Sequence, residues 1–191
     1  IIPQAMDIAM HIGFCRYTNE MVGKPLGDVT GMTDFETFKA AVYDEIRYLM
    51  SMGNERINVE MIAEKELFPD VFRSALMKDG VKEGKDMFSR RFKFENGSCM
   101  GAVGGVNAGN ALYAIKKLVF DEKKYTMAQL LEALDADWVG HEDMQKDFKA
   151  VPKYGNAIKE VDDLVAEVYQ LYADTCMSLP SAYGDSLKPN A

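Results

Sequence analysis

Histidine and cysteine are both scarce in this 191-residue chain, which has two histidines, His11 and His141, and three cysteines, Cys15, Cys99 and Cys176. The cysteines are odd in number and form no Cys-x-x-Cys pair, so their spacing predicts neither a disulfide framework nor a zinc site. We expect three buried free thiols. The two histidines are too far apart for a His-x-x-x-His pair, so no metal site is expected either.

Basic residues are outnumbered, with 22 Lys and Arg against 30 Asp and Glu and a formal net charge of −8. A chain of this charge repels polyanions, so nucleic acid is not expected as a partner. No apolar run approaches the roughly 18 to 20 residues that span a bilayer, and the first residues lack the pattern of a signal peptide. We therefore expect a cytoplasmic protein without a membrane partner.

The composition is that of a folded chain, with 48% hydrophobic and 27% charged residues. The 13 methionines are many for this length, and methionine fills irregular gaps, so a core of uneven shape is expected. The chain opens on Ile1-Ile-Pro-Gln without a methionine and closes just after a turn-rich stretch. We interpret residues 1–191 as one partial segment of a longer domain.

Apolar residues at helical spacing predict that most of the chain is helical. The expected helices cover residues 4–12, 33–65, 70–78, 106–120 and 126–134, a stretch ending at Lys149, and 158–172. Capping boxes at Thr33-Asp-Phe-Glu36 and Thr126-Met-Ala-Gln129 begin two of them, and Gly80 is expected to close another as a left-handed cap. Glycines and prolines mark residues 16–31 as a long irregular loop.

Residues 90–95 alternate between apolar and charged side chains, which predicts one short strand. A single strand forms no sheet of its own, so its partner is expected outside the chain. A glycine-rich turn follows, with glycines at 97, 101, 104, 105 and 109. Their spacing fits neither nucleotide-binding glycine motif, so close backbone packing is the favoured explanation.

Four polar residues are candidates for a chemical role. Glu95 ends the strand beside an apolar face, where it is either a partly buried acid, base or anchor, or one half of a solvated ion pair; the sequence favours the ion pair. His11 ends the first helix, and a core or capping role is its default because no neighbouring residue marks it as a base. His141 is expected on the surface, and Cys99 is expected as a buried thiol rather than a nucleophile.

Three segments, taken in order, resemble the pyruvate formate-lyase-like glycyl radical enzymes. They are Gly105-Val-Asn-Ala-Gly-Asn-Ala-Leu-Tyr-Ala-Ile-Lys-Lys-Leu-Val-Phe, Leu130-Leu-Glu-Ala-Leu134 and Val151-Pro-Lys-Tyr-Gly-Asn156. The resemblance implies an α/β fold in which this chain is a mostly helical segment of a ten-stranded barrel. The family's thiyl cysteine lies on a Gly-Cys-x-Glu-type loop and its radical glycine on an Arg-Val-x-Gly-Tyr loop, and neither motif occurs here. No catalytic residue is therefore expected in this segment, which alone should be inactive.

The resemblance also implies how a full-length enzyme would work. A radical SAM activating enzyme installs the glycyl radical, and this segment itself binds no cofactor. The full-length subunit forms a homodimer. It cleaves or forms a C–C or C–X bond in a small carboxylate-bearing substrate. The segment Phe92-Lys-Phe-Glu-Asn96 is most similar to the arylacetate decarboxylase branch, in which Glu95 and His11 match substrate-binding positions. The alternatives are a fumarate-adding enzyme of the alkyl- or benzylsuccinate synthase type, a diol dehydratase, a formate acetyltransferase-like lyase, or a non-catalytic interaction module.

Overall fold

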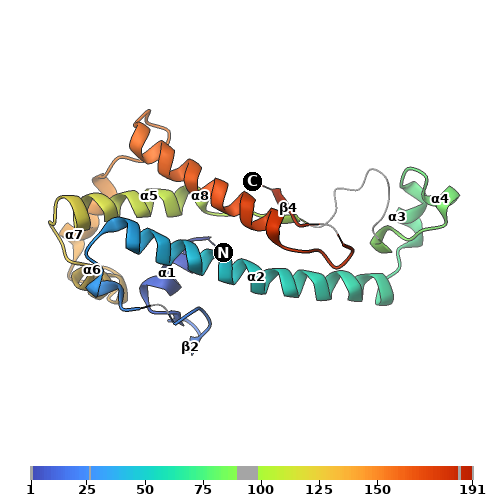
Figure 1. Ribbon diagram of the computed structural model, residues 1–191, viewed down its shortest axis with the longest axis horizontal. Helices are drawn as coiled ribbons and strands as arrows, with labels where there is room; N and C mark the ends of the chain where they lie inside the picture. Colours follow the sequence, from blue (N-terminus) through green and yellow to red (C-terminus); the bar gives the residue numbers. More distant parts are fainter. Residues whose placement is uncertain (1, 26, 90–98, 185, 191) are drawn as a thin grey trace. The chain divides into compact units, whose positions relative to one another are not determined.

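The computed structural model describes residues 2–25, 27–89, 99–184 and 186–190. The strand predicted at 90–95, with Glu95, lies outside these ranges. The chain divides into two units, one formed by residues 1–49 and 102–171 and the other by residues 50–101 and 172–191. Two long helices, α2 (Phe35–Leu67) and α8 (Lys159–Ser178), contribute residues to both units, and Figure 1 labels the elements.

The first unit is built mainly from helices, as the apolar spacing predicted. Besides its parts of α2 and α8 it contains α1 (Ile2–Met10), α5 (Gly105–Ile115), α6 (Met127–Asp135) and α7 (Glu142–Ala150). A π-helical turn, η3 (Lys116–Asp121), continues α5, and a 3-10 turn, η1 (Val29–Gly31), precedes α2. The loop predicted at 16–31 includes part of a small antiparallel hairpin of β1 (Phe14–Cys15) and β2 (Glu20–Met21).

The second unit holds the remaining parts of α2 and α8 together with α3 (Val71–Leu76), α4 (Gly80–Glu83) and the 3-10 turn η2 (Met87–Ser89). Its strands β3 (Cys99–Gly101) and β4 (Lys188–Asn190) pair in parallel, with Met100 opposite Pro189. The sequence predicted a single strand in the whole chain, whereas the described residues form four short strands that pair within it. The pairing of β3 with β4 joins residues far apart in the sequence and so leaves no local pattern, whereas β1 and β2 form a local hairpin of two residues each.

Two predicted helix caps were wrong, at Thr33 and at Gly80, and the helix before Gly80 ends at Leu76. Helix α2 is capped by Asp34 rather than Thr33, because the Asp34 Oδ1 accepts from the Thr37 amide at 2.8 Å. The left-handed residue is Asp79, at φ 65°, and Gly80 begins α4 instead of closing the preceding helix. The capping box at Thr126 and Gln129 is confirmed, with both reciprocal hydrogen bonds present.

The glycines at the start of α5 allow close packing, which confirms that interpretation for Gly104, Gly105 and Gly109 but not for Gly101, where an added Cβ would meet only the Asn190 carbonyl oxygen at 4.0 Å. A Cβ on Gly104, whose φ is +84°, would lie 2.5 Å from Pro3 Cγ. A Cβ on Gly105 would lie 2.8 Å from the Tyr169 ring, and a Cβ on Gly109 would lie 2.4 Å from Val165 Cγ2, both on α8. Because a side chain would collide at each position, glycine lets α5 approach its neighbours.

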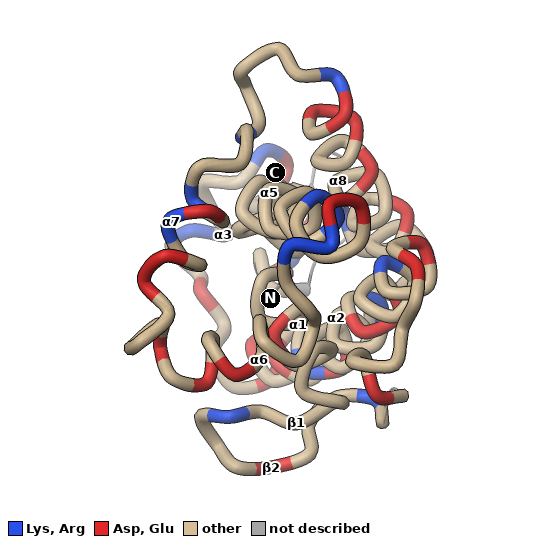
Figure 2. Tube along the Cα trace, turned by 90° about the vertical axis from the view of Figure 1, so that its left-hand side faces the viewer, with Lys and Arg blue, Asp and Glu red and all other residues tan. Residues whose placement is uncertain are grey.

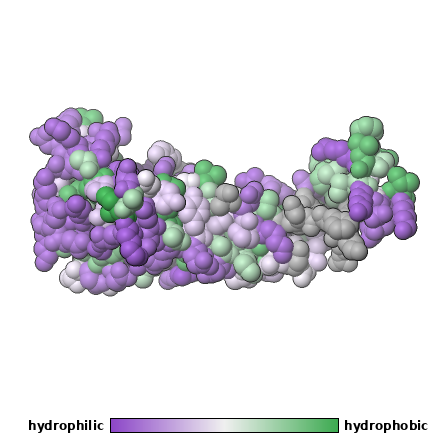
Figure 3. Space-filling model, turned by 90° about the horizontal axis from the view of Figure 1, so that it is seen from above, coloured by the Kyte–Doolittle hydropathy of each residue, from purple (hydrophilic) through white to green (hydrophobic). Residues whose placement is uncertain are grey.

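The surface of the described chain is mixed in charge and locally apolar. Acidic and basic residues both occur on the helices, and α8 is mainly acidic, with Glu160, Asp162, Asp163, Glu167 and Asp174 beside the single basic residue Lys159 (Figure 2). Large apolar side chains are exposed on α3 and α4, among them Val71, Phe72, Leu76 and Val81, where Figure 3 shows green surface. Within the described ranges, no helix is both long enough and apolar enough to cross a membrane.

Candidate functional site

The two substrate-binding candidates differ in what the structure shows. Glu95 lies outside the described residues, so its surroundings and its separation from His11 are not described. His11 follows the last residue of α1 and has a side chain that is 12% exposed. The assignment of both residues to substrate binding stays a prediction.

Both ring nitrogens of His11 face oxygen atoms. Nδ1 donates to the carbonyl oxygen of Asp7 at 2.7 Å, and because a carbonyl only accepts, this nitrogen carries a hydrogen. Nε2 lies 3.1 Å from the Oδ1 of Asp135, at the end of α6. The ring is therefore held in one orientation by a main-chain contact on its own helix and a carboxylate on another.

Arg16 joins the same group of charges. Its guanidinium contacts the Asp7 carboxylate at 2.7 Å and the Asp135 carboxylate at 3.2 Å, and it donates to the Leu134 carbonyl at 3.1 Å. We call His11, Asp7, Arg16 and Asp135 the His11 cluster. Its two carboxylates and one guanidinium give the surroundings of the imidazole more negative than positive charge.

The His11 cluster adjoins a surface hollow of about 530 Å³. Asp7 and Arg16 line it, together with Cys15 and Tyr17 of the hairpin, whereas His11 does not. Hydrogen bonds from the side chain and backbone of Thr18 lower the pKa of the Cys15 thiol. The hollow is therefore lined by Arg16, which is paired with Asp7 and Asp135, and by the Cys15 thiol, whose pKa is below that of an ordinary cysteine.

A buried carboxylate anchors the loop behind the hairpin. Glu45 of α2 is fully buried, and its Oε2 accepts from the Lys24 amide at 3.0 Å, while its Oε1 has no hydrogen-bond partner among the described residues. A Cβ on Gly23 would lie 2.2 Å from that Oε1, so a side chain there would force Glu45 to move. Burial raises the pKa of Glu45, because the charged form loses its hydration.

The cysteines are free, as predicted, but they are not all buried. Cys176 is buried, Cys15 is half-buried and Cys99 is exposed on β3. The expectation of a buried Cys99 was wrong, because this residue lies in a short strand of three residues whose outer positions face solvent. His141 is half-buried at the N-cap of α7, close to the surface position expected for it.

Only one member of the His11 cluster, His11 itself, was predicted as a site residue. Asp7 stands four residues before His11 on the same predicted helix, a spacing that brings side chains together and could have identified the pair. Asp135 is separated from His11 by 124 residues, so no local signal connects them. Among the described residues, no group of three or more His, Cys, Asp or Glu side chains is placed to hold a metal ion.

Comparison with known proteins identifies relatives along nearly the whole chain. Residues 2–191 match the family model for pyruvate formate lyase-like proteins. The (2S)-3-sulfopropanediol dehydratase of Klebsiella oxytoca is 29% identical over 98% of this chain and 23% of its own length. The indoleacetate decarboxylase of Tractidigestivibacter scatoligenes is 23% identical over 88% of this chain and 22% of its own length.

A solved structure shows the same fold. The hydroxyproline dehydratase from Clostridioides difficile, with trans-4-hydroxy-L-proline bound, superposes with a TM-score of 0.89 at 26% identity, over 98% of this chain and 24% of that one. The chain thus spans about a quarter of the length of the relatives it matches.

Proposed function

This chain belongs to the pyruvate formate-lyase-like family of glycyl radical enzymes, and on that premise we propose that the whole protein is a radical lyase acting on a small organic substrate. The match over residues 2–191 carries the proposal, supported by the TM-score of 0.89. We place the chain in the helical part of an α/β barrel. The whole protein would be a homodimer whose glycyl radical is installed by a radical SAM activating enzyme.

This chain supplies the surroundings of the chemistry rather than the radical itself. None of Cys15, Cys99 and Cys176 is followed two places on by a glutamate, and no Arg-Val-x-Gly-Tyr segment occurs. The chemistry of the glycyl radical, hydrogen abstraction from substrate through a thiyl radical, would come from other segments of the protein. The residues present here can bind, orient and shield a substrate.

Two reactions, dehydration and decarboxylation, are supported to different degrees. Dehydration is the first candidate, because a dehydratase matches nearly the whole chain at 29% identity, against 23% for the indoleacetate decarboxylase. Decarboxylation of an arylacetate is the second, supported by the resemblance of Phe92-Lys-Phe-Glu-Asn96 to that branch. In both reactions a small polar substrate needs an anchoring group beside an apolar surface.

We assign the anchoring roles to Glu95 and His11. The geometry around His11 suggests how it would act, since the Asp135 carboxylate on its Nε2 is 54% exposed. A carboxylate-bearing substrate can replace Asp135 at this nitrogen without disturbing the Nδ1 contact to Asp7. His11 would then hold the substrate by a charge-assisted hydrogen bond.

Activation of the full-length protein tests the proposal. The protein is incubated without oxygen with its activating enzyme and S-adenosylmethionine, and the glycyl radical is sought by electron paramagnetic resonance. The activated protein is then given glycerol, 1,2-propanediol, 3-sulfopropanediol, trans-4-hydroxyproline and indoleacetate, and products are separated by mass spectrometry. Absence of a glycyl radical signal would refute membership in a working radical enzyme, and a product from indoleacetate alone would replace dehydration by decarboxylation.

Matched variants test the two anchoring residues. Glu95→Gln and His11→Asn are expected to lower turnover at normal radical content, whereas Glu83→Gln and His141→Asn are expected to leave it unchanged. Asp135→Asn should lower KM, because it weakens the contact that substrate must displace. Equal turnover in Glu95→Gln and Glu83→Gln would show that Glu95 does not bind substrate and would favour its alternative role in a surface ion pair.

A further inference from the structure

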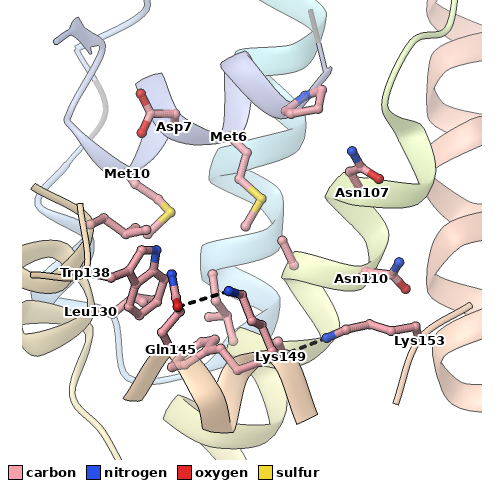
Figure 4. A pocket seen from close by; sticks show the side chains of 16 residues that line it. Met6, Asp7, Met10, Asn107, Asn110, Leu130, Trp138, Gln145, Lys149 and Lys153 are labelled. Atoms are coloured by element: carbon pink, nitrogen blue, oxygen red, sulfur yellow. Dashed lines mark hydrogen bonds between the residues drawn. The ribbon is translucent and has the colours of Figure 1, made fainter. Parts of the chain in front are cut away.

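A second hollow in the first unit has the features of a ligand site. It measures about 450 Å³ and lies among α1, α5, α6 and α7. Its wall is mainly apolar, with Met6 and Met10 from α1, Leu130 from α6, Phe148 from α7 and Trp138 from the turn between α6 and α7 (Figure 4). Pockets for small molecules have volumes of about 300 to 1,000 Å³ and walls of this kind.

Trp138 reaches the hollow through an unusual backbone turn. Asp137 and Trp138 are consecutive residues with positive φ, at 49° and 65°, a backbone conformation that residues other than glycine rarely adopt. The turn is fixed by a hydrogen bond from the Trp138 amide to the Ala133 carbonyl at 2.8 Å, and the indole lies 5.9 Å from the Phe148 ring. A strained turn that keeps a half-buried indole at the wall of a hollow is typical of a binding site.

Two lysines give one edge of the hollow a positive charge, while the lining carboxylate of Asp7 is paired with Arg16 at 2.7 Å. The Lys149 ammonium donates to the Gln145 side-chain oxygen at 3.0 Å, and the Lys153 ammonium donates to the Phe148 carbonyl at 2.9 Å. Neither ammonium forms an ion pair with a carboxylate in the described part of the chain, unlike Lys116. Partial burial lowers the pKa of Lys153, because no anion offsets the lost hydration.

A donor on α5 adds to this edge. The Asn110 Oδ1 accepts from the Tyr154 amide at 2.8 Å, which orients the side-chain amide and leaves its Nδ2 available to donate. Lys153 and Tyr154 belong to the Pro152-Lys-Tyr-Gly-Asn156 segment, which thus contributes both a cation and the contact that orients Asn110. Ammonium and amide groups at one end of an apolar wall are complementary to a carboxylate attached to an apolar body.

We infer that this hollow binds a small amphipathic carboxylate, with its apolar body against Trp138, Phe148 and the methionines and its carboxylate beside Lys149 and Lys153. The flexible methionine side chains can adjust to bodies of different shape. The inference does not rest on the proposed radical chemistry, because it concerns binding by residues of this chain alone.

Calorimetric titration of the full-length protein tests the inference with octanoate and its neutral analogue octanamide. We expect saturable binding of octanoate, with octanamide at least about 10-fold weaker, a factor that corresponds to about 1.4 kcal/mol. Lys153→Met and Lys149→Met keep the aliphatic chain while removing the charge, and each should weaken octanoate binding by about 3- to 10-fold. Lys146→Met is the matched control, because Lys146 is exposed on the same helix and does not line the hollow.

Three outcomes would overturn the inference. The first is no saturable octanoate binding by the full-length protein, as when another segment of the polypeptide fills the hollow. The second is equal affinity for octanoate and octanamide. The third is an octanoate affinity that is the same in the Lys149→Met/Lys153→Met double variant as in Lys146→Met, which would place the bound ligand elsewhere.

Discussion

Replacing Gly109 by alanine tests how closely α5 packs against α8. A Cβ at this position would lie 2.4 Å from Val165 Cγ2 and 3.0 Å from Val165 Cα. Rotating the valine side chain relieves the first contact but not the second, which involves the main chain. The two helices must therefore move apart to admit a single methyl group.

The expected loss follows from two opposing contributions. Overpacking a well-packed interior costs about 1 to 3 kcal/mol, and a main-chain collision places this case near the upper value. Alanine in place of glycine within a helix returns about 1 kcal/mol. The net loss in the free energy of unfolding is therefore about 2 kcal/mol. For a chain of 191 residues this loss lowers the melting temperature by about 4 to 8 °C.

Thermal unfolding followed by circular dichroism measures this loss, with Gly31→Ala as the control. Gly31 has no atom within 4 Å of an added Cβ, so its variant should melt within about 2 °C of the parent. Adding Val165→Ala to Gly109→Ala removes the closer contact and should restore about 1 kcal/mol beyond the sum of the single effects. Equal melting of Gly109→Ala and Gly31→Ala would refute the close packing of α5 on α8.

Three further predictions concern a cap, a buried acid and the thiols. Asp34→Ala should cost about 1 kcal/mol in urea unfolding, while Thr33→Ala stays within about 0.5 kcal/mol, and the reverse order would make Thr33 the cap. The folded state raises the pKa of Glu45, so it binds a proton more tightly than the unfolded state, and stability should fall as the pH rises above the usual glutamate pKa of about 4.3. Glu45→Gln should remove that fall above the usual glutamate pKa, and an unchanged pH profile would contradict the buried acid. In the native protein an aromatic disulfide reagent should react with Cys99 and spare Cys176, and equal rates would contradict their different exposures.

Features fixed by neighbouring residues were predictable. The Thr126 and Gln129 capping box is confirmed because both of its hydrogen bonds join residues three apart. The helical stretches around α1, α5 and α6 were located because one apolar face recurs every three to four residues. The family resemblance was likewise readable, since it rests on continuous segments such as Pro152-Lys-Tyr-Gly-Asn156.

Helix ends were less predictable, since several residues compete for each one. Thr33 and Asp34 are adjacent and both are good caps, and the fold selects the aspartate because helix α2 begins at Phe35. Helix α8 continues to Ser178, beyond the predicted end at 172, because buried contacts extend it where the sequence shows no stop signal. The π-helical turn Lys116–Asp121 has no recognised local signature.

The sequence alone determined the family of this protein and its largely helical composition. Each of these depends on residues that are close together along the chain. Only the tertiary structure decided that Asp135 contacts His11 and that the buried Glu45 accepts a hydrogen bond from the Lys24 amide. It also decided that Trp138, Lys149 and Lys153 line one hollow. Such contacts arise when distant segments pack together, and the packing depends on the shape of the whole core, which leaves no mark on any single stretch of sequence.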